Sequence, residues 1–152
     1  MSISARLKTL LDQSKIPYSV MTHQTTYTAQ GTAATMQISA KELAKTVVAW
    51  AGGEMILAVL PGPRHVKLHK LGAEIGKPVR LASEQEFITC FPDCEVGAMP
   101  PIGSLYNLPV YVDESLADDQ EIVFNAGTHH DAIRMRYEDF VRVVKPKVCS
   151  FA

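Results

Sequence analysis

The histidines of this chain are the first residues to consider as catalysts, because imidazoles bind metals and transfer protons near neutral pH. His65 and His69 are four residues apart and would share one face of a helix, as zinc ligands often do. The glutamate of a zinc-protease motif is missing, and Lys67 lies between them. His129 and His130 are adjacent, so in an extended segment they point to opposite faces. We expect no metal and no cofactor, with a metal hydrolase as the least favoured alternative.

Lys45 and two glycine-containing segments offer a different chemistry. Lys45 follows a short helical turn, with a capping box at Ser39 and Glu42, and begins an apolar strand. A lysine in that place often only complements the helix dipole. The glycines of Gly97–Gly103 and Gly127–His130 let backbone N–H groups approach a ligand, as an oxyanion site requires. No nucleophile elbow and no glycine-rich phosphate loop is present, which disfavours a serine triad, nucleotide hydrolysis and hydride transfer.

Length and composition indicate one compact domain spanning residues 1–152. The chain has 152 residues, 47% hydrophobic and 20% charged, with no low-complexity tract. The N-terminus lacks the apolar core of a signal peptide, and no stretch approaches a membrane span, so we expect a cytoplasmic protein without membrane contact. The three cysteines fit no zinc pattern and are expected to be reduced.

The net charge of −1 argues against nucleic-acid binding through bulk electrostatics. Local contact stays open, because basic residues cluster twice, although solvated charged faces show the same pattern. The first cluster falls within 17 positions and the second lies near the end of the chain: Arg64, Lys67, Lys70, Lys77 and Arg80; Arg134, Arg136, Arg142, Lys145 and Lys147.

Helical and strand patterns alternate along the chain. Apolar residues at helical spacing, capping boxes and helix-ending residues predict helices over 2–13, 27–36, 66–75, 83–91 and 138–144. Runs rich in β-branched residues predict strands over 18–22, 45–51, 54–60, 108–114, 121–127 and 132–137, with Gly52-Gly53 closing a tight hairpin. This order predicts an α+β fold, a mixed and largely antiparallel sheet with surrounding helices.

Several ordered blocks together resemble the YbaK/ProX superfamily of aminoacyl-tRNA deacylases, which includes the editing insertion domain of bacterial prolyl-tRNA synthetases. The resemblance runs from about His23 to Phe140. It is carried by "AKTVV" before the Gly-Gly hairpin, "VLPGPRHVKLHKL", "FPDCEVGAMPPIG", "LPVYVDESL" and "NAGTHHDAIRM". It implies the fold of that superfamily and hydrolysis of the ester that joins a wrong amino acid to the 3′ end of a tRNA.

The resemblance also implies site residues. The family's pocket lysine falls on Lys45, its Gly/Pro loop on Val96-Gly97 and Pro101-Ile102-Gly103, and its late glycine turn on Gly127-Thr128-His129. The implied catalytic residues are Lys45, Gly97, Gly103 and His129, and the implied substrate-binding residues are Thr26, Ala98, Met99, Pro101, Ile102, Gly127 and Thr128. His130 is expected to turn away, and Asp131 to be a solvated turn residue.

The ester is activated by the neighbouring ribose hydroxyl, so positioning a water and stabilising the oxyanion can suffice. Small residues such as Ala98, Ala126 and Gly127 beside Met99 suggest a pocket for a small side chain such as alanine, with tRNA-Pro as the first tRNA to consider. The loop Gly-Ala-Met-Pro-Pro-Ile-Gly departs from the Gly-Gly-x-Ser-Pro-x-Gly of the YbaK subgroup, so cysteinyl-tRNA specificity does not carry over. The alternative function is a non-catalytic module that binds a tRNA end or a synthetase.

Overall fold

The computed structural model describes residues 5–22 and 40–152 of the chain. The helix expected over 27–36, the Ser39 half of one capping box and the predicted site residue Thr26 lie outside these ranges. The described helices are α1 (Ala5–Gln13), α3 (Leu68–Ile75), α4 (Glu84–Phe87) and α5 (Tyr137–Val144). Short 3-10 turns, among them η1 (Ala40–Glu42) and η3 (Gly103–Leu105), connect some of the elements. No described helix has both the length and the apolar character that crossing a membrane would require.

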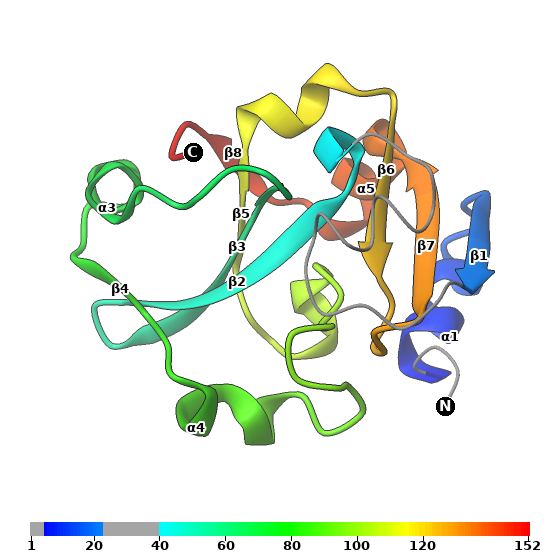
Figure 1. Ribbon diagram of the computed structural model, residues 1–152, viewed down its shortest axis with the longest axis horizontal. Coiled ribbons are helices and arrows are strands. Elements are labelled where there is room, and N and C mark those ends of the chain that lie inside the picture. Colours follow the sequence, from blue (N-terminus) through cyan, green and yellow to red (C-terminus); the bar gives the residue numbers. More distant parts are fainter. Residues whose placement is uncertain (1–4, 23–39) are drawn as a thin grey trace.

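The described residues contain eight strands, which form two sheets that lie side by side (Figure 1). The three-stranded sheet has the order β1-β7-β6, and the five-stranded sheet has the order β4-β2-β3-β5-β8. The strands are β1 (Tyr18–Thr22), β2 (Ala44–Ala51), β3 (Glu54–Pro61), β4 (Val79–Leu81), β5 (Val110–Asp113), β6 (Glu121–Asn125), β7 (Asp131–Arg136) and β8 (Lys147–Cys149). The predicted α+β class with a mixed, largely antiparallel sheet is therefore confirmed, with its strands divided between two sheets.

The β2–β3 hairpin is the central element of the five-stranded sheet. Ala51 pairs with Glu54 across a two-residue turn, as the Gly52-Gly53 pair predicts. Gly52 has a φ of +59°, which is the positive φ that the first residue of a type II′ hairpin turn requires. Both strands are mostly buried, so apolar layers cover both faces of this hairpin.

The sequence patterns did not predict two short strands, β4 and β8. β4 and β8 have three residues each, too few to show a period of two, and they are recruited by pairing with β2 and β5. β5 pairs in parallel with both β3 and β8, which makes the sheet mixed.

Three apolar clusters hold the elements together. The main core packs the two sheets against α1 and α5 and includes Leu7, Leu57, Phe124 and Phe140. The second core lies on the other face of the five-stranded sheet, under α3, and includes Ala49, Ile56, Ala58, Leu60, Leu71 and Phe151. A small bridge cluster, formed by Leu43, Val123 and Ala132 with Met21 packed against it, lies where the two sheets meet.

Gly103 begins η3 at a point where the chain leaves no room for a side chain. A Cβ atom built on Gly103 would lie 2.1 Å from the Leu108 carbonyl oxygen and 2.6 Å from a methyl group of Val110. The Gly103 carbonyl oxygen also accepts hydrogen bonds from the N–H groups of Tyr106 and Leu108. The loop can therefore fold back on itself only with glycine at this position.

Replacing Gly103 with alanine should lower the free energy of unfolding by about 3 kcal/mol, because the added methyl group collides with backbone that no rotamer change can relieve. Gly53→Ala is the control, since a Cβ atom at Gly53 meets nothing within 4 Å. It should change stability by less than about 0.5 kcal/mol. Urea unfolding of both variants measures the difference, and equal stabilities would contradict the packing role.

Candidate active site

Lys45 is the second residue of β2 and lies near the junction of the two sheets. η1 ends just before β2, and the N–H of Gly62 donates to the Leu43 carbonyl oxygen at 2.7 Å, which fixes the start of the strand. Lys45 pairs with Leu60 of β3. Because Leu60 belongs to the second core, Lys45 points to the face of the five-stranded sheet that carries α3.

The Lys45 ammonium is half-buried and has no counter-ion within residues 5–22 and 40–152. Among the described residues, none forms an ion pair or a hydrogen bond with its side chain. Burial lowers the pKa of Lys45 below the usual value for a lysine, because a partly desolvated site disfavours the charged form. A cation held in this way is available to a negative charge that a ligand brings or that a reaction creates.

Asn125, at the end of β6, is a neighbour that the sequence analysis missed. Leu43 and Val123 form a parallel bridge and are buried together in the bridge cluster. Lys45 and Asn125 each follow two residues later, and residues two apart on a strand share a face, so both side chains lie on the same side. The Asn125 Oδ1 atom is buried and accepts no hydrogen bond from the part of the chain that the structure describes. A ligand could complete this arrangement, in which an acceptor and a cation on the same side both lack a described partner.

The two glycine-containing segments lie against one another. The Glu95 N–H donates to the Gly127 carbonyl oxygen at 2.7 Å, and the Gly127 N–H donates to the Ala98 carbonyl oxygen at 2.9 Å. The His129 N–H donates to Glu95 Oε1 at 2.7 Å, and His129 Nε2 lies 2.6 Å from the Val96 carbonyl oxygen. Asn125 ends β6 two residues before Gly127, so the Gly127 turn continues from this strand and the Gly97 loop lies against it.

Gly97 allows this close approach of the loops. Its φ is +85°, a conformation that favours glycine, and a Cβ atom built on it would lie 3.3 Å from His129 Cε1. The Gly97 N–H donates to Met99 Sδ at 3.2 Å, and a thioether is a weak acceptor. The His129 side chain is 8% exposed and contacts the Gly97 loop, so its ring is placed by the loop.

The other predicted members of this loop are buried. Ala98 and Ile102 are fully buried and Met99 is 6% exposed, with Met99 and Ile102 in the main core. Pro101 and Gly103 are also buried. The inner side of the loop is thus part of the core. Within residues 97–103, Gly97 is the exposed residue.

The expectation that Asp131 is a solvated turn residue is wrong. Asp131 begins β7, is 5% exposed and accepts a hydrogen bond from Thr128 Oγ1 at 2.7 Å. Thr22 of β1 donates to the same carboxylate at 3.4 Å, and His130 Nε2 lies 3.4 Å from it. Thr128, predicted to bind substrate, is fully buried and also accepts from the Asp131 N–H. The structure gives the Thr128 hydroxyl a role in shaping the turn.

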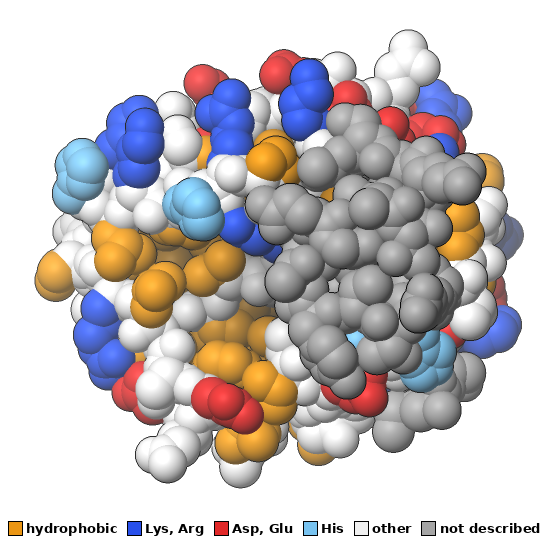
Figure 2. All heavy atoms as spheres, viewed as in Figure 1, with side chains coloured by type: hydrophobic (Ala, Val, Ile, Leu, Met, Phe, Trp, Pro, Cys, Tyr) orange, Lys and Arg blue, Asp and Glu red, His pale blue; other side chains and the backbone are white. Residues whose placement is uncertain are grey.

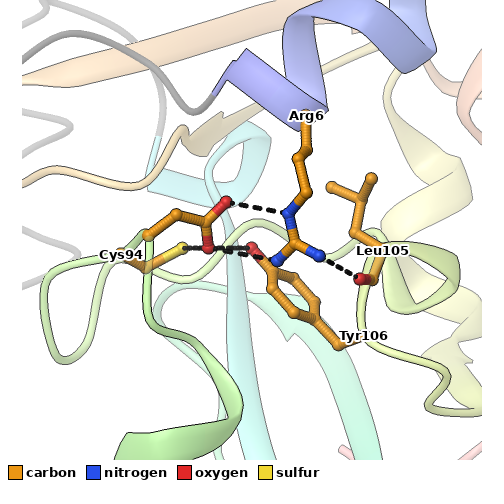
Figure 3. Close-up of polar contacts among 5 residues, drawn as sticks. Arg6, Cys94, Leu105 and Tyr106 are labelled. Carbon is orange, nitrogen blue, oxygen red and sulfur yellow. Dashed lines mark hydrogen bonds and ion pairs between the residues drawn. The ribbon is translucent and has the colours of Figure 1, made fainter.

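A network around Arg6 ties α1 to the chain on both sides of the Gly97 loop (Figure 3). The Arg6 guanidinium bonds the Asp93 carboxylate and donates to the Leu105 carbonyl oxygen at 3.0 Å. It also lies over the Tyr106 ring, 4.9 Å from its centroid. Tyr106 Oη bonds Asp93 at 3.1 Å and lies 3.1 Å from Cys94 Sγ. Burial raises the pKa of Cys94 to about 11, so this thiol stays protonated and serves as a packing group.

The histidine pair His65 and His69 does not share a helical face, because α3 begins at Leu68. In the described ranges, no three His, Cys, Asp or Glu side chains gather in a way that could hold a metal ion. All three cysteines are free thiols.

Residues 23–143 match the family described as the aminoacyl-tRNA editing domain. The chain belongs to this family. The match covers nearly the same residues as the resemblance found in the sequence and confirms it. The expected enzyme class, aminoacyl-tRNA deacylase, is confirmed at the level of the family.

Among curated proteins, the Ser/Thr-tRNA deacylase ProXp-y of Escherichia coli K12, described as multifunctional, is 27% identical over 152 residues. The alignment covers 96% of this chain and 90% of that protein. The same protein from Escherichia coli O157:H7 matches equally well.

Two solved structures share the fold. The hypothetical protein APE2540 gives a TM-score of 0.88 at 21% identity, covering 96% of this chain and 98% of that one. A candidate trans-editing enzyme for prolyl-tRNA synthetase gives a TM-score of 0.83 at 22% identity, covering 99% and 98%.

The lowered pKa of Lys45 and its place beside Asn125 can be tested together. The Lys45 amine should titrate below the ordinary lysine value, and Asn125→Asp should raise its midpoint, because an adjacent carboxylate favours the ammonium. Nitrogen-detected NMR of the lysine side chains, assigned with Lys45→Met, measures both. Asn107→Asp adds the same charge at an exposed position and should leave the midpoint unchanged. An unmoved midpoint in Asn125→Asp would show that the two side chains do not share a side.

Proposed function

We propose that this protein hydrolyses mischarged aminoacyl-tRNA in trans, releasing a small amino acid from the 3′ end, with Lys45 and Asn125 at the reacting ester. Two observations carry the proposal: within the described residues the Lys45 ammonium has no counter-ion and the buried Asn125 Oδ1 has no donor, and the Leu43–Val123 bridge sets both side chains on one side of the sheet junction. Membership of the editing family supplies the substrate class.

The reaction needs a water, an electrostatic partner for the oxyanion and a fixed ester. The water oxygen attacks the ester carbonyl carbon and gives up a proton, the bond to the ribose oxygen breaks, and the ribose oxygen takes up that proton as the free amino acid leaves. Lys45 stabilises the negative charge that develops on the carbonyl oxygen, in a partly desolvated site where such an interaction is strong. The substrate α-ammonium donates to Asn125 Oδ1, which orients the ester.

The loops beyond Asn125 form the wall of the acyl pocket in this proposal. Gly97 and Gly127 bring backbone close to the substrate, and the His129 ring packs against Gly97. A substrate oxygen can compete with Met99 Sδ for the Gly97 N–H, whereas the Ala98 N–H already donates to the Glu95 carbonyl oxygen. Gly103, because of its packing role, has no part in the chemistry.

A small side chain is the proposed specificity, since the wall contains the small residues Ala98, Ala126 and Gly127, whereas Met99, expected from the sequence to supply bulk, packs in the main core. Alanine on tRNA-Pro remains the first candidate. The name of the E. coli relative adds serine and threonine as further candidates. A synthetase that delivers the tRNA is part of the proposal, because the net charge of −1 gives little general attraction for RNA.

Lys45→Met should lower the rate of deacylation at least about 100-fold, because it removes the charge and keeps the apolar stem. Lys8→Met makes the same chemical change at an exposed residue of α1 and should leave the rate unchanged. The substrates are tRNAs charged with alanine, serine, threonine and proline, and free amino acid is measured. If no substrate turns over, the protein is the non-catalytic binding module; an active Lys45→Met would remove this lysine from the mechanism.

Asn125→Leu should separate function from stability. Removal of a buried acceptor that lacks a donor should leave the free energy of unfolding unchanged or raise it by about 1 kcal/mol. The same change removes the proposed partner of the α-ammonium and should reduce kcat/KM by about 10- to 100-fold. Urea unfolding and single-turnover deacylation give the two values. A variant with full activity would contradict the proposed role of Asn125.

A further inference from the structure

A run of exposed basic residues leads away from the start of β2. It begins three residues after the end of β3 and extends into the first turn of α3, and its members are Arg64, His65, Lys67, His69 and Lys70. Figure 2 shows Lys, Arg and His side chains gathered along one edge of the face in view, over α3 and the segment before it. In a chain with a net charge of −1, this concentration of positive charge is local.

The arginine and the lysines of this run have no partner in the described part of the chain. Among the described residues, none bonds or pairs with the side chains of Arg64, Lys67 or Lys70. Arginines elsewhere have partners: Arg80 pairs with Glu86 at 2.9 Å, and Arg134 pairs with Glu121 at 3.3 Å. The charges of the run are therefore available to an external anion.

The run begins beside Lys45 and stays on the same side of the sheet. Pro61 pairs with Ala44, and the Gly62 N–H donates to the Leu43 carbonyl oxygen at 2.7 Å, so the chain leaves β3 next to the start of β2. α3 then covers the second core through Leu71, on the face to which Lys45 points. A polyanion that lies along the run reaches Lys45 at one end.

Acidic residues lie next to the basic run at Arg64. Arg64 lines a surface pocket together with Asp113, Glu114 and Asp118, and these acidic groups repel phosphates. The favourable path for a polyanion therefore follows α3 and turns toward Lys45 at Arg64.

We propose that this basic run is the surface on which the tRNA backbone docks, with the phosphates before the 3′ end on Arg64, Lys67 and Lys70 and the aminoacyl end at Lys45. The inference rests on the proposed function. RNA fits better than a protein partner because the run has no exposed apolar centre: Val66 and Leu68 are only partly exposed, and Val66 packs on the second core. Phosphate contacts of this kind position the RNA without reading its sequence.

The test is the variant Arg64→Ala/Lys67→Ala/Lys70→Ala against a control that removes three exposed cations elsewhere, Lys8→Ala/Lys15→Ala/Arg136→Ala. Binding of uncharged tRNA is measured over a range of salt concentrations, so the readout does not depend on turnover. The first variant should bind about tenfold or more weakly, and the slope of log K against log salt should fall by roughly 2 to 3, one phosphate contact for each cation. The control should bind like the wild type.

A second measurement separates docking from chemistry. Hydrolysis of an adenosine that carries the amino acid as a ribose ester, a substrate with no phosphate to contact the run, should be equally fast in the wild type and in both variants. Equal weakening of tRNA binding by both variants, or an unchanged salt slope in the first, would overturn the docking surface. A wild type that binds tRNA with the predicted salt slope but hydrolyses nothing would instead overturn the proposed function and leave the surface in place.

Discussion

The proposed site depends on one parallel bridge, between Leu43 and Val123, which joins the two sheets and sets Lys45 and Asn125 on the same side of their junction. Neither side chain has a hydrogen-bond or ion-pair partner among the described residues. Burying a carboxamide oxygen without a donor costs about 1–3 kcal/mol, and partial burial of an ammonium adds to that cost. The hairpin pairing of β2 with β3 and the buried bridge cluster hold both groups in place despite this cost.

The Gly97 loop and the Gly127–His129 turn, which form the proposed wall of the acyl pocket, are held together by hydrogen bonds. Glu95, Val96 and Ala98 are joined to the Gly127–His129 turn by backbone and side-chain hydrogen bonds, and Arg6 fastens α1 to both ends of the same loop. Glycines give the loop its shape, and hydrogen bonds from distant segments then fix that shape. In the proposed site, these hydrogen bonds would preorganise the backbone that faces the substrate.

Local features of the sequence predicted local structure well. The Gly52-Gly53 hairpin and the capping box of Ser83 and Glu86 are both present, since each depends on residues a few positions apart. β4 and β8 were missed because their pairing is non-local. Asn125 could not be singled out, since its significance is the absence of a partner in three dimensions. The burial of Asp131 also depends on non-local pairing, since β1, far away in the sequence, pairs with β7 and sets Thr22 directly opposite this carboxylate.

The inner face of the Gly97 loop is buried in the main core, so the proposed selectivity for the amino acid and the stability of the fold depend on the same loop. Met99 and Ile102 face the main core while the same loop forms the proposed wall of the acyl pocket. A substitution that reshapes this wall therefore disturbs core packing at the same time. New amino-acid preferences in this protein would have to evolve together with compensating changes in the core, so a stable ancestor has more freedom to change its substrate than a marginal one.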